Sequence, residues 1–157
     1  MLNIGIDIAS KKHDCCIMGA KGDVLTPVFT FENNAGGFDV LLKNIRKHER
    51  DAGQVRVGLE STGHYGDNLI SFLRARSFNI TVFNPLQVDL YRKAGTLRKT
   101  KTDKADAKFI AQMLLTTENS TRADTSPSIV ELKALVRHRH RIKAMRTKLK
   151  VSVTRLV

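Results

Sequence analysis

LNIGIDIA, residues 2–9, is the stretch that decides the fold, because aliphatic side chains alternate in it with small or polar ones. Successive side chains of a β-strand point to opposite faces of the sheet. One face therefore carries the aliphatic residues, and the other carries Asn3, Gly5, Asp7 and Ala9. A strand this apolar is expected in the centre of a sheet, where a carboxylate is costly to bury unless a cation receives it. Asp7 is therefore the first candidate functional residue.

VRVGLE, residues 55–60, repeats this pattern in a second predicted strand. Its aliphatic side chains share one face, and Glu60 lies on the other face, two residues after Gly58. The two strands thus share the order glycine, aliphatic residue, acid. Glycine within a strand often marks a place where backbone or ligand approaches closely. Two strands of one sheet with this pattern can bring Asp7 and Glu60 together.

A third acidic element is TDKAD, residues 102–106, at the start of a predicted helix that runs to about residue 117. Side chains three or four positions apart share a helix face, so Asp106, Ile110, Met113 and Thr117 form one stripe with Asp103 at its N-terminal end. Both aspartates are therefore expected on the packing side of this helix, facing the acids of the sheet.

Four carboxylates packed toward one another repel and either raise one another's pKa or require cations. Mg²⁺ prefers oxygen ligands and keeps positions open for water and phosphate, and two such ions suit phosphoryl transfer. We therefore predict a catalytic and metal-binding set that holds two Mg²⁺ ions, for which Mn²⁺ can substitute, and that consists of Asp7, Glu60, Asp103 and Asp106.

Each acid also has a purely structural alternative. Asp103 can be no more than a helix N-cap, Glu60 can simply end a strand, and Asp7 can bond turn amides. The remaining acids, including Asp14, Asp23, Glu32 and Asp67, are expected in turns or on the surface. The occurrence of all four acids on these elements favours the metal site.

The rest of the chain supplies the other elements of an α/β domain. The patterns predict strands over residues 13–18, 24–31 and 79–83 and helices over residues 38–49 and 65–76, while residues 86–101 are polar and basic. The order βββ-α-β-α-β-α is typical of an RNase H-like mixed sheet with flanking helices. This assignment rests on an analogy between folds. Because one fold can carry many functions, the activity has to be inferred from the residues of the site.

The composition points to a polyanionic partner. Lys and Arg number 27 against 15 acids, giving a formal net charge of +12. Such an excess is typical of proteins that bind nucleic acid, although a merely soluble basic protein is the alternative. Cys15 and Cys16 are the only cysteines, and the chain has neither a zinc-ligand spacing nor a signal peptide or membrane span. These features predict a cytoplasmic protein with no membrane partner.

The C-terminal segment is a long basic helix by its pattern. Residues 118–128 read as a linker between a domain over residues 1–117 and a helix over residues 129–157. Leu135, Ile142, Leu149 and Leu156 recur every seven residues, which predicts a coiled coil and a homo-oligomer. The helix stops without Gly or Pro, so we expect the chain to be part of a longer protein.

Four motifs together make the chain resemble the DEDD transposases of insertion sequences, a family that includes pilin-gene invertases and bridge-RNA-guided recombinases. These motifs are GIDIASKKHD, GLESTGHYGDNL, FNPLQVDLYRKA and LRKTKTDKADAKFIAQML, which span residues 1 to about 117 in the expected order. The resemblance implies a RuvC-like domain whose tetrad falls on Asp7, Glu60, Asp103 and Asp106, followed by a coiled coil and a second domain with a nucleophilic serine. Nothing in this chain matches that second domain.

The resemblance also implies partners and an activity. The domain is expected to bind DNA and to take part in strand cleavage and exchange during transposition, with a structured guide RNA as a further candidate partner and the bacterial nucleoid as its location. The residues expected to hold nucleic acid are Lys99, Lys101, Lys104, Arg137, Arg139, Arg141, Lys143 and Arg146. Two alternatives stay open: a RuvC-type Holliday-junction resolvase, and a non-catalytic nucleic-acid-binding dimerisation module.

Overall fold

The computed structural model describes residues 1–61, 65–95, 103–117 and 127–154. Its strands are β1 (Leu2–Asp7), β2 (Lys12–Met18), β3 (Val24–Glu32), β4 (Val55–Glu60) and β5 (Asn79–Phe83). Its helices are α1 (Ala35–Arg46), the short 3₁₀ helix η1 (Ala52–Gln54), α2 (Asp67–Arg74), α3 (Pro85–Gly95), α4 (Asp103–Thr116) and α5 (Pro127–Thr154). The chain divides into two compact units, Met1–Ala123 and Asp124–Val157.

The five strands form one mixed sheet in the order β3-β2-β1-β4-β5. β1 lies at its centre, antiparallel to β2 and parallel to β4, and β5 continues the parallel half. The antiparallel and the parallel part of the sheet both follow from the connections, because a short turn joins antiparallel neighbours whereas a helical crossover joins parallel ones. The mixed α/β sheet predicted from the order of elements is confirmed.

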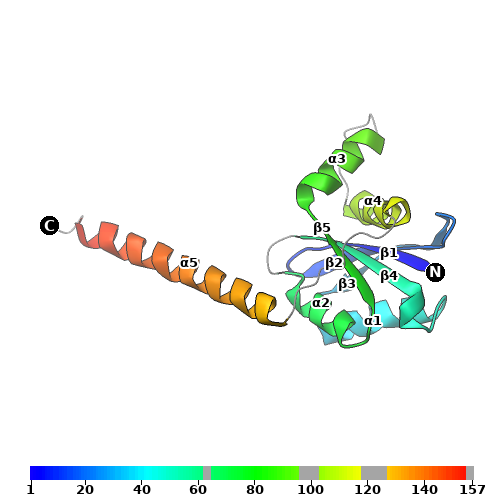
Figure 1. The fold of residues 1–157 in the computed structure, drawn as a ribbon, viewed down its shortest axis with the longest axis horizontal. Helices are drawn as coiled ribbons and strands as arrows, with labels where there is room; N and C mark the ends of the chain where they lie inside the picture. The colour runs from blue at the N-terminus through cyan, green and yellow to red at the C-terminus, as the bar shows by residue number, and fades with distance from the viewer. Residues whose placement is uncertain (62–64, 96–102, 118–126, 155–157) are drawn as a thin grey trace. The chain divides into compact units, whose positions relative to one another are not determined.

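Helices cover both faces of the sheet (Figure 1). The aliphatic face of β1 and β4 packs against α1 and α2 in the largest hydrophobic cluster, which includes Ile4, Ile6, Leu41, Leu59 and Leu73. The opposite face of the sheet carries α4, with α3 beside it, over two smaller clusters. The alternation seen in the sequence therefore separates a purely structural face from a face that bears the acids.

Glycine allows α4 to approach the sheet closely. A Cβ atom at Gly5 would lie 2.1 Å from the backbone oxygen of Ala107 and 2.3 Å from the backbone nitrogen of Ala111. Gly58 is less tightly enclosed, because a Cβ atom there would meet side chains rather than backbone, with Ile110 Cγ2 of α4 at 3.0 Å. The two glycines of the shared pattern thus form the surface of the sheet against which α4 packs.

Helix α3 was not predicted, because residues 86–101 show only a polar and basic composition in the sequence. Its start is well defined: Asn84 Oδ1 accepts a hydrogen bond of 2.9 Å from the backbone nitrogen of Leu86, and Pro85 is the first helical residue. Proline is favoured at this position because its missing N–H would have no partner inside the helix. Val88 then packs with Phe83 and Ile110.

The other boundaries differ from the predicted ones by a few residues. Helix α1 begins at Ala35 rather than Phe38, because Asn34 Oδ1 caps it by accepting from the backbone nitrogen of Gly37 at 2.9 Å. Residues 127 and 128 belong to α5 rather than to a linker, and the remainder of the predicted linker, residues 118–126, lies outside the described residues. No helix in the part of the chain that the structure describes has the length and apolar character that a membrane span requires.

Candidate active site

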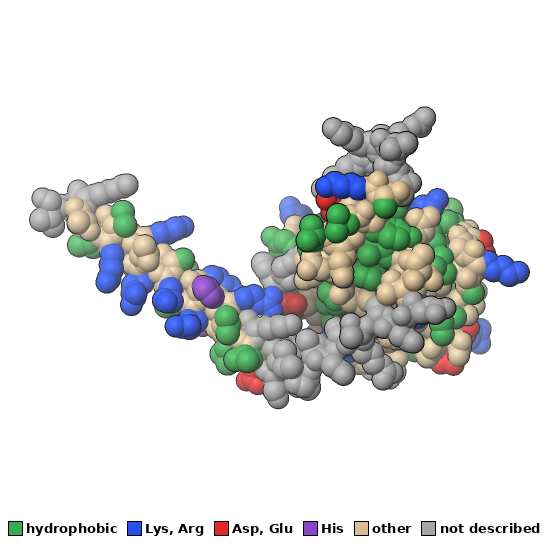
Figure 2. Space-filling view, turned by 45° about the horizontal axis from the view of Figure 1, so that its top comes forward, with side chains coloured by type: hydrophobic (Ala, Val, Ile, Leu, Met, Phe, Trp, Pro, Cys, Tyr) green, Lys and Arg blue, Asp and Glu red, His purple; other side chains and the backbone are tan. Residues whose placement is uncertain are grey.

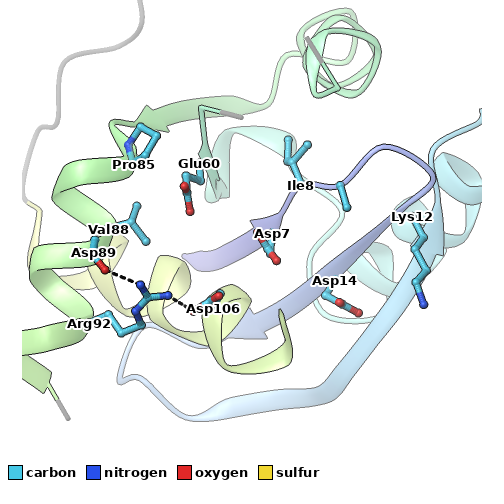
Figure 3. Close-up of a pocket in the computed structure, with 11 residues that line it drawn as sticks. Asp7, Ile8, Lys12, Asp14, Glu60, Pro85, Val88, Asp89, Arg92 and Asp106 are labelled. Atoms are coloured by element: carbon cyan, nitrogen blue, oxygen red, sulfur yellow. Dashed lines mark hydrogen bonds and ion pairs between the residues drawn. The ribbon is translucent and has the colours of Figure 1, made fainter. Parts of the chain in front are cut away.

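A cavity of about 460 Å³ lies where the carboxyl ends of β1 and β4 meet α3 and α4 (Figure 3). Carboxylates, two cationic side chains and a few apolar groups line it: Asp7, Ile8, Ala9, Lys12, Asp14, Glu60, Pro85, Val88, Asp89, Arg92 and Asp106. Three of the four acids predicted from the sequence, Asp7, Glu60 and Asp106, therefore line one cavity.

The sheet places Asp7 and Glu60 at the same level. The register of the parallel pair β1–β4 aligns Ile6 with Leu59, and each acid is the next residue on its strand. Both side chains are half-buried and point toward the cavity. Parallel strands end at the same edge of a sheet, which is why two acids far apart in sequence become neighbours.

Asp106 reaches the same cavity from the first turns of α4 and is only 6% exposed. Its position follows from the close contact of α4 with Gly5, since a larger residue there would push the helix away from the sheet. The Oδ1 atom of Asp106 accepts a hydrogen bond of 3.1 Å from Arg92 Nη1. This buried carboxylate is thus already paired with a cation.

Arg92 and Asp89 extend this pairing along α3. Arg92 Nη2 lies 2.5 Å from Asp89 Oδ1, and Lys93 Nζ lies 2.7 Å from Asp89 Oδ2. The hydrogen bonds from Lys93 and Arg92 lower the pKa of Asp89, whereas those to Asp89 and Asp106 raise the pKa of Arg92. Asp89 therefore stays ionised and fixes the guanidinium group at the wall of the cavity.

The structure does not test the whole predicted tetrad. Asp103 is the first residue of α4, but its side chain and that of Lys104 lie outside the described part. Lys99 and Lys101 lie outside the described residues altogether. Among the described residues, no group of three His, Cys, Asp or Glu side chains is close enough to hold a metal ion together. The predicted metal site therefore remains a prediction.

Four polar residues of the cavity were missed: Lys12, Asp14, Asp89 and Arg92. Asp14 was expected in a turn or on the surface, yet it lies opposite Asp7 in the β1–β2 register and lines the cavity. Its Oδ1 atom accepts a hydrogen bond from Thr30. Asp89 and Arg92 were missed because α3 itself was missed.

Asn33 ties together the two loops that leave the acid-bearing strands. Its Nδ2 atom donates to the backbone oxygen of Ser10, at 3.3 Å, and to that of Tyr65, at 3.0 Å. Beneath them, His13 is fully buried, and its Nδ1 atom accepts from the backbone nitrogen of Ala9 at 3.3 Å. Burial lowers the pKa of His13. A neutral imidazole therefore supports the turn that follows Asp7.

The second unit is helix α5, whose described side chains are exposed. The predicted nucleic-acid contacts that lie on it are Arg137, Arg139, Arg141, Lys143 and Arg146. Figure 2 shows Lys and Arg side chains along the length of this helix. Of the predicted seam, Leu135, Ile142 and Leu149 are 60%, 52% and 67% exposed. Pairing of this seam with a second copy is still a prediction.

The five-stranded mixed sheet, with acids at the ends of two central strands, has the arrangement of an RNase H-like fold. A solved structure of Thermus thermophilus RuvC matches 71% of this chain and 90% of its own, with a TM-score of 0.50 and 13% identity. The structure of T. thermophilus RuvC in complex with a Holliday junction substrate matches equally well, at a TM-score of 0.50 and 14% identity. This likeness establishes the fold.

Sequence comparison identifies the family, which the likeness of folds does not. The family model of the DEDD transposases of the IS110 type, described as transposase, matches residues 4–157, and the chain belongs to this family. The pilin gene-inverting protein of Moraxella bovis is 30% identical over 136 residues, which cover 87% of this chain and 41% of that protein. The corresponding protein of Moraxella lacunata matches to the same extent. The chain thus spans less than half the length of these relatives.

Proposed function

We propose that this domain is the metal-dependent nuclease-like part of a DNA transposase, which cleaves and exchanges DNA strands when an insertion sequence moves. The observation that carries the proposal is that Asp7, Glu60 and Asp106 line one cavity in a member of the DEDD transposase family. The name of the Moraxella relatives, pilin gene-inverting protein, supports a role in DNA rearrangement.

The donor set of the cavity suits Mg²⁺ or Mn²⁺. Asp7, Glu60 and Asp106 offer only carboxylate oxygens, the ligands that such hard cations prefer. Asp103, at the start of α4, would be the fourth ligand, and the set would hold two ions. Because no three of the described acids are within coordination distance of one another, we infer that ion binding draws the carboxylates together.

The acids of the cavity would have different roles in binding the ions. Bound ions would neutralise negative charge on the scissile phosphate and activate the attacking hydroxyl group. Asp7 and Glu60 would hold the ions at the rigid edge of the sheet, and Asp106 would close the site from α4. In this family the resemblance implies that a serine of a further domain supplies the covalent step, so no serine of this chain is given that role.

The basic residues would hold the nucleic acid. We infer that Lys99, Lys101 and Lys104 lie along the phosphates beside the acids, and that α5 pairs with a second copy or grips DNA through its cationic side chains. Such contacts release counterions, so the affinity should fall steeply as salt rises. A structured guide RNA is a further candidate partner. This role would place the protein in the cytoplasm, at the nucleoid.

A Mn²⁺ titration followed by electron paramagnetic resonance tests the metal site. Asp7→Asn and Asp106→Asn should each weaken Mn²⁺ binding by about tenfold or more, as loss of a metal-site interaction commonly does. Asp39→Asn is the matched control, because Asp39 is exposed on α1, on the opposite face of the sheet. Equal Mn²⁺ affinity in all three variants would contradict the proposal.

Activity separates this function from its two rivals. In the longer protein, Asp106→Ala should abolish recombination while the domain stays folded by circular dichroism. Cleavage of a four-way junction by this chain alone would instead favour a RuvC-type resolvase. DNA binding that depends on salt but ignores Mg²⁺, together with a fully active Asp106→Ala variant, would favour a non-catalytic binding module.

A further inference from the structure

The side chain of Arg92 crosses one wall of the cavity and joins two carboxylates of different elements. Its Nη1 atom donates to Asp106 Oδ1 on α4, and its Nη2 atom donates to Asp89 Oδ1 on its own helix, α3. Figure 3 shows the guanidinium group between the two acids. Arg92 thus forms a polar link between the helix that carries a predicted metal ligand and the helix that lies beside it.

The two partners of Arg92 differ in their surroundings. The side chain of Asp106 is 8% exposed, whereas that of Asp89 is 33% exposed and also binds Lys93. Asp106 is a predicted ligand of the divalent ion, and Asp89 lies one turn before Arg92 on the same helix. An ion that binds Asp106 Oδ1 would compete with Arg92 Nη1 for that oxygen, whereas the bond from Nη2 to Asp89 can persist.

A guanidinium group released from Asp106 stays close to the site, because Asp89 anchors it. Arginine offers its N–H groups in a planar fork that matches two oxygens of a phosphate. The Nη1 edge of Arg92 would then be available, beside the bound ions, to a phosphate of the nucleic acid. Positively charged groups at this place also stabilise the charge that develops on a transferring phosphoryl group.

We propose that Arg92 exchanges partners when the site is loaded, so that its Nη1 atom leaves Asp106 for a phosphate oxygen of the bound nucleic acid as a divalent ion takes Asp106. This exchange rests on the proposed function. It assigns Arg92 two roles: it neutralises the buried Asp106 carboxylate in the metal-free protein, and it positions the substrate phosphate in the loaded protein.

Mn²⁺ titrations of this chain, without nucleic acid, test the first role. Arg92→Met removes the competitor and should tighten Mn²⁺ binding by on the order of tenfold relative to Lys93→Met. Lys93→Met is the matched control, since it removes an equal charge from the neighbouring position and also frees Asp89 of one partner, but leaves Asp106 paired. Arg92→Gln serves the same comparison if Arg92→Met unfolds.

Fluorescence anisotropy of a labelled DNA duplex, with and without Mn²⁺, tests the second role. Mn²⁺ should raise the DNA affinity of the wild type and of Lys93→Met, and this gain should be lost in Arg92→Met although that variant binds Mn²⁺ more tightly. A merely structural arginine would not produce these opposite shifts.

Three results would overturn the exchange. The first is equal Mn²⁺ affinity of Arg92→Met and Lys93→Met. The second is weaker Mn²⁺ binding in Arg92→Met than in Lys93→Met, which would mean that Arg92 helps to position the metal ligands instead of competing with the ion. The third is a Mn²⁺-dependent gain in DNA affinity that Arg92→Met retains. A wild-type chain that binds no Mn²⁺ is a separate result, because it overturns the proposed function and the exchange together.

Discussion

Replacing Gly5 with alanine should cost much of the stability of the first unit. The added Cβ atom would lie 2.1 Å from Ala107 O and 2.3 Å from Ala111 N, and both are backbone atoms of α4. Ordinary contacts of a carbon atom are at about 3.5–4.0 Å, so α4 would have to move outward by more than an ångström. Overpacking of a core by a methylene group costs about 1–3 kcal/mol, and contact with rigid backbone places Gly5→Ala near the upper end of this range.

Gly36→Ala is the matched control for this prediction. A Cβ atom at Gly36 would be 3.5 Å from its nearest neighbour, Asn34 Oδ1, which is an ordinary contact. Gly36 lies within α1, where alanine lowers the conformational entropy of the unfolded chain and should raise the free energy of unfolding by about 0.4–1 kcal/mol. Replacement of glycine by alanine should therefore lower the free energy of unfolding at Gly5 and raise it at Gly36.

Urea unfolding monitored by circular dichroism measures both variants. Gly5→Ala should lower the free energy of unfolding by about 3 kcal/mol and should also weaken Mn²⁺ binding, because it moves Asp106 away from Asp7. If the free energy of unfolding of Gly5→Ala is within about 0.5 kcal/mol of the wild-type value, the close packing of α4 on Gly5 does not limit stability and the reasoning is refuted. An equal loss of stability in Gly36→Ala would refute it too.

Two further predictions concern single polar contacts. Burial lowers the pKa of His13 below its ordinary value of 6.5, so the unfolded chain binds this proton more readily and the free energy of unfolding should fall as the pH drops below about 6.5. His13→Gln should flatten this fall in urea titrations, whereas the exposed control His138→Gln should not; identical pH profiles would exclude the buried imidazole as its source. Arg56 Nη2 donates to Thr117 O at the end of α4, at 2.7 Å, so Arg56→Met should lower the free energy of unfolding by about 1 kcal/mol. Arg50→Met, at an exposed position, is the control, and equal effects of the two variants would show that the contact with α4 contributes nothing.

The central part of the fold could be predicted because its pattern is unambiguous. Alternation in residues 2–9 and 55–60 separates an aliphatic face from a face with glycine and acid, and a central strand of a mixed sheet needs both. The helix that carries Asp106 was predicted because its apolar stripe has helical spacing. These two periodicities predicted that Asp7, Glu60 and Asp106 face one another, and the three side chains line one cavity.

Helix α3 could have been predicted from its first two residues. The pair Asn84-Pro85 follows the predicted strand over residues 79–83, and Asn at the N-cap with Pro at the first helical position is a signal for the start of a helix. Among its described apolar side chains Val88 is buried, whereas Leu86 and Leu90 are 64% and 58% exposed. With one buried apolar position, the helix lacks the apolar stripe that indicates a packed helix in sequence.

The cations and the two additional acids of the cavity could not be predicted from local patterns. Asp14 becomes a neighbour of Asp7 only through the hairpin register, and Arg92 meets Asp106 only after two helices pack together. Both contacts depend on tertiary structure. Spacing along the chain showed where acids share a face, but not which basic side chain would neutralise them.

The two helices on the acid-bearing face differ in how firmly they are held. Helix α4 contributes five apolar side chains that are at most 6% exposed, whereas Val88 is the buried apolar side chain described in α3. Local opening requires least free energy where fewest apolar contacts are lost. We therefore expect α3 to open before α4 on heating, so that Arg92 leaves Asp106 while α4 and the sheet persist. The buried carboxylate would then lose its cation before the rest of the domain melts.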